Sequence, residues 1–117
     1  MVRVIVAGGR NFIPSENDER WLITMLKALE ATHVISGCAK GADTFGETIA
    51  KKLKLPIMQY PADWNKFGKS AGYKRNIQMA DNADALIVFE GGKGTAMMID
   101  IARKKGLKTI QHFTFKE

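Results

Sequence analysis

The chain has 117 residues, which is enough for one domain with its own hydrophobic core. Hydrophobic residues make up 45% of it and charged residues 26%, and this composition excludes collagen-like, intrinsically disordered and disulfide-stapled proteins. No apolar run approaches the roughly 20 residues that cross a bilayer, so we expect no membrane partner. Eighteen basic and twelve acidic residues leave a net charge of +6, which favours an anionic partner without distinguishing a nucleotide from a nucleic acid.

Cysteine and histidine are too sparse for two common kinds of site. Cys38 is the only cysteine and cannot form an intrachain disulfide, and with two histidines there is no cluster of metal ligands. We therefore expect no metal and no resident cofactor. The apolar stretch at the N-terminus is too short for a signal peptide, which predicts a cytoplasmic protein.

The first predicted unit is a buried strand followed by an amphipathic helix. Residues 2–7 (VRVIVA) are apolar and β-branched, as in a strand of a parallel sheet, and a turn at residues 8–10 (GGR) ends the strand. Ser15 is a good N-cap for the helix, and Asp18 places an acidic residue three positions later. The residues expected to face the core recur at helical spacing: Trp21, Leu22, Met25, Leu26 and Leu29.

The next segment predicts two short strands separated by a helix. Residues 33–36 (HVIS) form the second predicted strand, and residues 37–43 (GCAKGAD) form a glycine-rich turn. A helix follows to about Leu53, and Pro56 prevents its continuation. Residues 57–60 (IMQY) form the third predicted strand.

The second half begins with residues 61–72 (PADWNKFGKSAG), predicted as a long irregular loop of the kind that often carries function. A helix of about two turns is expected over residues 73–82. Residues 85–89 (ALIVF) are the most hydrophobic segment, which predicts a central strand. A second glycine-rich turn, residues 90–95 (EGGKGT), leads into a helix that ends near Lys105. Gly106 is its expected C-cap, and residues 108–112 form the last predicted strand.

The regular alternation of strands and helices predicts a single α/β domain over residues 1–117. We expect a mostly parallel sheet of about five strands with helices on both faces. Ligands of open sheets of this kind bind beyond the carboxyl ends of the strands. The turns at residues 8–10, 36–43 and 91–95 are all expected at that edge.

A glycine-rich turn that opens a helix suits a phosphate, because its backbone can approach the anion and the first N–H groups of the helix are unpaired. The turn at residues 91–95 is the strongest instance, although neither a Walker A loop nor a full dinucleotide fingerprint is present. The simpler reading is that these glycines only make tight turns. As ligand contacts from the first and last turns we expect Gly8, Gly9, Gly91, Gly92, Gly94 and Thr95.

Polar residues of the first two turns complete one side of the expected site. Arg10 could clamp a phosphate or a carboxylate, or be an ordinary surface arginine. Asp43 could accept a hydrogen bond from a ribose hydroxyl, or compensate the dipole of its helix. We expect Ser36, Gly37 and Gly41 to lie on the sugar side of the same ligand.

The other side of the expected site comes from the loop at residues 61–72 and the helix after it. Trp64 could stack on a base or cover the edge of the core, and Asp63 lies beside it. Arg75 and Asn76 suit contacts to phosphate, ribose or base, or belong to a solvated helix face. A helix N-terminus near Cys38 could lower its pKa, but no His or Asn partner is evident and we do not predict a nucleophile.

Four blocks of the sequence resemble the SLOG superfamily, and specifically the YspA-type (cpYpsA-related) domains, relatives of the Lonely Guy phosphoribohydrolases and of the DNA-processing protein DprA. The blocks are AGGR followed by Phe12, SGCAKGAD, PADWNKFGKSAGYKRNIQM and ADALIVFEGGKGT, and together they cover nearly the whole chain. The resemblance implies a Rossmann-like fold that binds a nucleotide or a nucleotide-derived ligand. It also implies a homo-oligomer.

Part of the Lonely Guy catalytic pattern is present. Its arginine, its methionine and the Ala-Asp pair before the strand are matched by Arg75, Met79, Ala83 and Asp84. In those enzymes the arginine and a glutamate after the glycine loop cleave the N-glycosidic bond of a nucleoside monophosphate. The resemblance therefore implies a catalytic Arg75, but Met98 stands at the position of the glutamate. A carboxylate could come only from different geometry, with Asp43, Asp63 and Asp100 as the candidates.

The block SGCAKGAD is also similar to the corresponding turn of DprA, which binds single-stranded DNA. A single-stranded nucleic acid is therefore the alternative partner. Basic and aromatic residues that could hold phosphates and stack bases follow each other in Lys66, Phe67, Lys69, Tyr73 and Lys74. A net charge of +6 over the whole domain is modest for that role.

Overall fold

Residues 1–112 are described in a computed structural model of the chain. Five strands form one sheet, in the order β3-β2-β1-β4-β5, and all neighbouring pairs are parallel. The strands are β1 (Arg3–Ala7), β2 (His33–Ser36), β3 (Ile57–Gln59), β4 (Ala85–Phe89) and β5 (Lys108–His112). The prediction of a parallel α/β sheet is confirmed.

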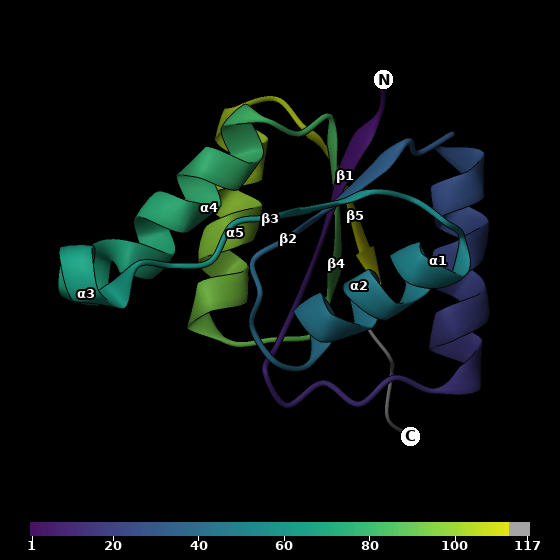
Figure 1. The fold of residues 1–117 in the computed structure, drawn as a ribbon, viewed down its shortest axis with the longest axis horizontal. Helices are drawn as coiled ribbons and strands as arrows, with labels where there is room; N and C mark the ends of the chain where they lie inside the picture. Colours follow the sequence, from purple (N-terminus) through teal and green to yellow (C-terminus); the bar gives the residue numbers. More distant parts are fainter. Residues whose placement is uncertain (113–117) are drawn as a thin grey trace.

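Helices cover both faces of the sheet, as predicted. Figure 1 shows α1 (Glu16–Ala28) and α2 (Ala42–Lys52) on one side, and α4 (Ala71–Asp81) and α5 (Lys93–Lys104) on the other. The Cα radius of gyration is 13.2 Å, close to the roughly 13 Å expected of one compact domain of this size. The arrangement is a Rossmann-like α/β fold.

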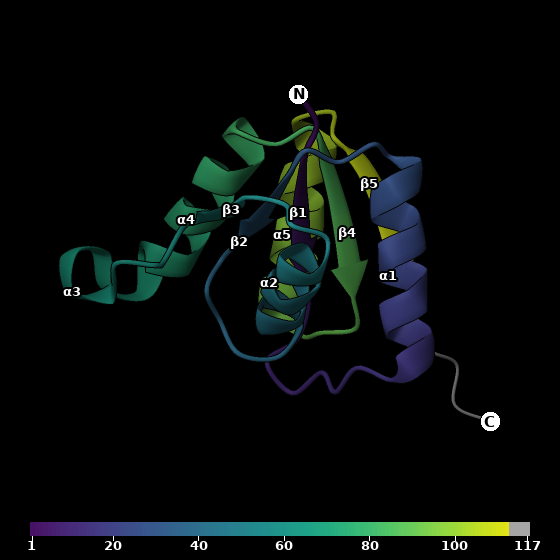
Figure 2. The ribbon, with the colours of Figure 1, turned by 45° about the vertical axis from the view of Figure 1, so that its right-hand side comes forward.

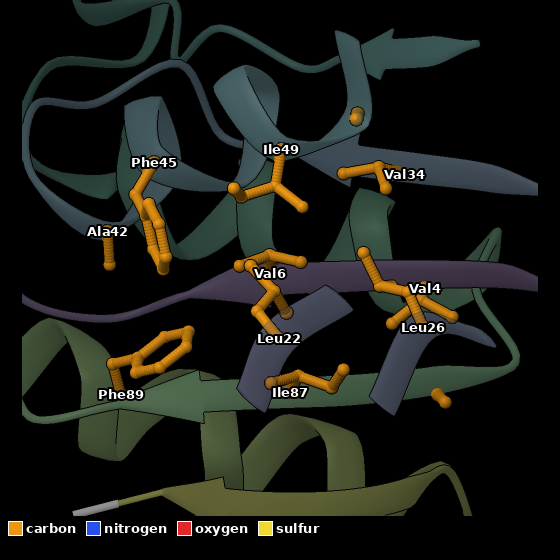
Figure 3. Close-up of a cluster of buried hydrophobic side chains, with 12 residues drawn as sticks. Val4, Val6, Leu22, Leu26, Val34, Ala42, Phe45, Ile49, Ile87 and Phe89 are labelled. Carbon is orange, nitrogen blue, oxygen red and sulfur yellow. The ribbon is translucent and has the colours of Figure 1, made fainter. Parts of the chain in front are cut away.

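The core is divided between the two faces because successive residues of a strand point to opposite sides. Val4 and Val6 of β1 pack under α1 and α2, where Leu22 and Phe89 join them (Figure 3). Ile5 and the other inward residues of the opposite face pack against α4 and α5. The largest members of that second cluster are Ile5, Ile35, Leu86, Met79 and Met98.

The start of α1 is fixed by local hydrogen bonds that the sequence predicted. The Asp18 backbone N–H donates to the Ser15 hydroxyl at 3.1 Å, and the Ser15 N–H donates to the Asp18 carboxylate at 2.8 Å. Asp18 also contacts Nε2 of His112 at 3.2 Å, and the His112 ring stacks on Trp21 with centroids 4.0 Å apart. The helix is thereby tied to the end of β5, a contact the sequence did not indicate.

The order of the strands places one crevice at the carboxyl edge of the sheet. From β1 the chain proceeds outward to β2 and β3, and then crosses to β4 on the other side of β1. The middle strand is therefore β1. Residues 85–89, predicted as a central strand, form β4, which is paired on both sides and buried along its whole length. Ligands of such sheets bind at this change of direction, outside the ends of β1 and β4.

The prediction of an irregular loop over residues 61–72 is wrong in part. The segment contains α3 (Trp64–Phe67) and the 3-10 turn η1 (Gly68–Ser70), and α4 already begins at Ala71. Asp63 caps α3 by accepting a hydrogen bond from the Lys66 N–H at 3.1 Å. No residue of α3 is buried, so an apolar periodicity was missing from the sequence. Figures 1 and 2 both show α3 lying away from the sheet, at the end of α4.

Within the part of the chain that the structure describes, no helix combines the length and the apolar character needed to cross a membrane. The longest helix there is α1, with 13 residues. A membrane span needs about 20 residues.

Gly46→Ala tests how closely α2 lies against β1. A Cβ at Gly46 would be 2.7 Å from the Cβ of Val6, so helix and strand would have to move apart. We expect the free energy of unfolding to fall by about 1–3 kcal/mol, outweighing the roughly 1 kcal/mol that alanine gains in helix propensity. Urea unfolding measures it. Thr48→Ala, on the exposed face of α2, is the control, and equal midpoints for the two variants would contradict this packing.

Candidate functional site

Three turns meet at the carboxyl edge of the sheet through the backbone of Gly9. Its N–H donates to the carbonyl of Glu90 at 2.7 Å, in the turn that follows β4. Its carbonyl accepts from the N–H of Ala42 at 3.2 Å, at the start of α2, and from the N–H of Phe12 at 3.3 Å. The sequence predicted that these turns share an edge, and the structure places them in direct contact.

This contact requires glycine at two positions. A Cβ at Gly41 would overlap the carbonyl oxygens of Gly9 and Arg10, and the φ of +78° at Gly41 is one that other residues rarely adopt. A Cβ at Gly9 would lie 2.9 Å from the carbonyl oxygen of Glu90. The glycines are therefore needed for the turns to approach each other, whatever ligand they bind.

A cavity of about 410 Å³ opens between the turns and α4; we refer to it as the first cavity. Its volume lies within the range of about 300–1,000 Å³ that is typical of small-molecule sites. Ten of the residues predicted from sequence line it: Gly8, Gly9, Arg10, Asp43, Trp64, Arg75, Asn76, Gly92, Gly94 and Thr95. The structure thus brings most of the predicted site together.

Five predicted residues do not line the first cavity. Ser36 is fully buried and donates its hydroxyl to Glu47 at 2.6 Å, which turns it away from the cavity. Gly41 supports the turn contact described above. Asp63 is engaged in capping α3, on the exposed segment before α4. Gly91 lies against Thr95, and Gly37 lines a neighbouring cavity instead.

Arg75 is held in place by two hydrogen bonds. Its Nη1 donates to the Gly37 carbonyl at 2.5 Å, and its Nε donates to the Asn76 side chain at 2.9 Å. These bonds fix the guanidinium at the wall of the cavity, with Asn76 buried beside it. Burial lowers the pKa of Arg75, and the carboxylate of Asp43 opposes that shift.

Of the described residues that line the first cavity, Asp43 is the one with an acidic side chain. Only 7% of its surface is exposed, and its Oδ2 accepts from the Ala39 N–H at 3.1 Å. Burial raises the pKa of Asp43 to about 6, against the effects of the Ala39 N–H and of the Arg75 charge. Burial of this kind in a concave site is typical of functional carboxylates.

Gly37 lies next to both of these side chains, Arg75 and Asp43. A Cβ there would lie 2.8 Å from Arg75 Nη1 and 2.9 Å from Asp43 Oδ2. The space that a side chain would fill is thus occupied by the guanidinium and the carboxylate. Gly37 contributes to the site by allowing this approach.

The two helices that begin at the cavity differ from α1 in how they start. The N-caps of α2 and α5 are Gly41 and Gly92, and neither provides a capping side chain. The first N–H groups of a helix have no partner within the helix, and they favour a nearby anion. At α1 the hydroxyl of Ser15 accepts a hydrogen bond from one of these groups, the N–H of Asp18. At α5 the first-turn residues Gly94 and Thr95 line the cavity.

The sequence reasoning missed part of the cavity lining. Met98 is 2% exposed, and with Met79 and Met97 it adds an apolar surface to the cavity. Tyr73 and Lys69 line it as well, although the sequence assigned them only to the alternative nucleic-acid surface. Spacing along α4 could have indicated Tyr73, since it lies three residues before Asn76 on the same helix face.

The suggestion of a lowered pKa at Cys38 is wrong. Burial, followed by the charge of Glu47, raises the pKa of this thiol. Glu47 is also the acceptor for Ser36, so its negative charge stays near the turn. The thiol is exposed but is not activated by its surroundings.

Across residues 1–112, no group of three or more His, Cys, Asp or Glu side chains is arranged to hold a metal ion. No family model and no curated protein matches the sequence. The resemblance noted from the sequence therefore stays an expectation, and the site has to be interpreted from its own geometry.

Asp43→Asn tests the raised pKa of this carboxyl. The folded protein holds the proton up to about pH 6, whereas an unfolded aspartate releases it near 3.8, so the stability contributed by Asp43 falls as the pH rises through this window. The difference corresponds to about 3 kcal/mol. Asparagine does not titrate, so the variant should gain stability relative to the natural chain, by up to that amount, when urea unfolding is compared below and above the window. Parallel pH dependences would contradict the raised pKa.

Proposed function

We propose that the first cavity binds a nucleotide or a nucleotide-derived ligand through its phosphate. One observation carries the proposal: Arg10, Arg75 and the uncapped start of α5 line the same cavity, at the change of strand direction between β1 and β4. Arginine forks and helix N-termini are both suited to phosphate oxygens. Their convergence favours an anionic ligand over the reading in which the glycines only make turns.

The phosphate would lie against the last turn, where Gly92, Gly94 and Thr95 supply backbone N–H groups and a hydroxyl. The backbone is open there, since a Cβ at Gly92 or Gly94 would meet no atom within 4 Å. Arg75 and Arg10 would contact the same phosphate from the opposite wall.

The organic part of the ligand would fill the rest of the cavity. Trp64 and Tyr73 are each 51% exposed, and both line the cavity, where they offer flat surfaces for a base. Asp43 and Asn76 present a carboxyl and an amide for ribose hydroxyls. The aromatic side chains would thus contact the base, and the polar side chains would contact the sugar.

The resemblance extends the proposal to hydrolysis of an N-glycosidic bond, with Arg75 as the catalytic arginine. Of the three aspartates that could supply the missing carboxylate, Asp100 pairs with Lys104 at 3.0 Å on the surface of α5, and Asp63 caps α3. Asp43 is the one in the cavity. Free base released from a nucleoside monophosphate, and lost in Arg75→Ala, would favour the hydrolase; intact ligand that still binds would favour a sensor or a sequestering protein.

Arg10→Ala tests the phosphate contact. Arg10 is exposed, so the variant should fold. We expect its affinity for AMP and ADP, measured by titration calorimetry, to fall about 10- to 100-fold, because a hydrogen bond to a charged group contributes about 1.5–3 kcal/mol.

Arg103→Ala is the matched control, since it removes the same charge from the last turn of α5. It should leave the affinity unchanged. A folded natural chain that binds neither nucleotide would remove the proposal, and equal losses in the two variants would reduce it to general charge attraction.

Single-stranded nucleic acid is the second candidate, because a basic and aromatic surface adjoins the cavity. Trp64, Phe67 and Tyr73 are all exposed on or near α3. The ammonium groups of Lys66 and Lys74 lie 5.2 and 4.7 Å from the centre of the Phe67 ring. Such a surface could stack bases and hold phosphates, although two of its three aromatic rings also line the first cavity.

Fluorescence anisotropy of a labelled single-stranded oligonucleotide tests this second candidate. Binding should weaken steeply with added salt, because phosphate contacts release counterions. Phe67→Ala should reduce it and leave nucleotide binding intact, since Phe67 does not line the first cavity. Unchanged anisotropy at low salt would reject a nucleic-acid partner. The homo-oligomer implied by the resemblance is likewise a proposal, tested by light scattering, and so is the cytoplasmic location expected from the sequence.

A further inference from the structure

A second cavity, of about 520 Å³, adjoins the first. Four residues line both: Arg10, Ala39, Trp64 and Arg75. The second cavity is completed by Asn11, Gly37, Cys38, Lys40, Pro61 and Ala62. Two arginines, Arg10 and Arg75, are thus shared by the lining of both cavities.

Arg75 makes hydrogen bonds to residues of both cavities. Its Nη1 is bonded to the carbonyl of Gly37, which lines the second cavity, and its Nε to Asn76, which lines the first. The charges of Arg10 and Arg75 are close enough for Arg10 to contribute to the lowered pKa of Arg75. Two neighbouring cations of this kind suit two neighbouring negative charges.

The two cavities differ in chemistry. The first has the apolar surface of Met79, Met97 and Met98. The second has the amide of Asn11, the ammonium of Lys40 and the backbone of the turn after β2, next to the small apolar side chains of Pro61 and Ala62. The larger share of donors and acceptors in the second cavity suits a polyhydroxylated group better than a base.

We propose that the ligand has two organic parts joined by a pyrophosphate: a nucleoside diphosphate that carries a second, sugar-like group. The nucleoside lies in the first cavity, the pyrophosphate beside the start of α5 and the two arginines, and the second group beside Asn11 and Lys40. This inference rests on the proposed function and specifies the class of ligand. A mononucleotide would occupy the first cavity and leave the second empty.

Two matched pairs of probes test the inference by titration calorimetry: ADP with ADP-ribose, and UDP with UDP-glucose. Within each pair the ligands differ by the second sugar, and the two pairs differ in the base. In at least one pair we expect the sugar-bearing ligand to bind about 10-fold more tightly or better, a difference of about 1.4 kcal/mol. Nucleoside diphosphates that bind as tightly as their sugar-bearing partners would overturn the inference and leave the proposed function standing. Absence of binding by all four would remove both.

Variants of the second cavity locate the added affinity. Asn11→Ala with Lys40→Ala should bring the sugar-bearing ligand down to the affinity of the nucleoside diphosphate, which itself should change little. Both residues are exposed, so the double variant should fold. Lys51→Ala, an exposed lysine in the last turn of α2, is the control and should have no effect. A double variant that retains the full preference for the sugar-bearing ligand would overturn the placement.

Cys38 gives a readout that needs no variant, because it is the only cysteine of the chain and lines the second cavity. The rate of its alkylation by iodoacetamide, an uncharged reagent, is measured with saturating nucleoside diphosphate and with the sugar-bearing ligand. We expect the sugar-bearing ligand to slow alkylation well below the rate seen with the nucleoside diphosphate. Equal rates with the two bound ligands would show that the second cavity is not occupied, and would overturn the inference.

Discussion

The backbone of Gly9 holds the site together. Its N–H and carbonyl link the turns after β1 and β4 and the start of α2. These hydrogen bonds form only because Gly9 and Gly41 carry no side chain that would separate the turns. With the turns fixed in this way, Arg10, Asp43 and Thr95 line one cavity although they lie far apart in the sequence. The geometry of the site is therefore set by backbone hydrogen bonds, and its chemistry is added by side chains.

Charge in the cavity is only partly balanced. Arg75 is fixed by hydrogen bonds to Gly37 and Asn76. The negative charge of Asp43 partly offsets the unfavourable burial of its guanidinium. Asp43 itself is held in surroundings that favour its protonated form. Near neutral pH a buried carboxylate is unfavourable there, and the start of α5 has no side-chain cap.

The sequence predicted the strands and long helices well because their signals are local. Apolar β-branched runs identified the strands, and the spacing of Leu22 and Leu26 identified α1. It failed for α3, which has no buried face, and for the start of α4, which it placed two residues too late although Ala71 and Gly72 are buried. The sequence also predicted Ser36 as a ligand contact, whereas its hydroxyl donates to the carboxylate of Glu47. Glu47 lies eleven residues later, and no local pattern connects the two residues.

The sequence alone determined the α/β class, the parallel sheet and the edge at which the glycine-rich turns gather, because periodicity and glycine-rich turns specify these locally. Only the tertiary structure decided which residues share a cavity. It excluded Asp63 and Asp100 as cavity carboxylates, selected Asp43, and revealed that Arg10 and Arg75 line two cavities. The reason is physical: the direction and burial of a side chain depend on long-range packing, on which a single sequence carries no local signal.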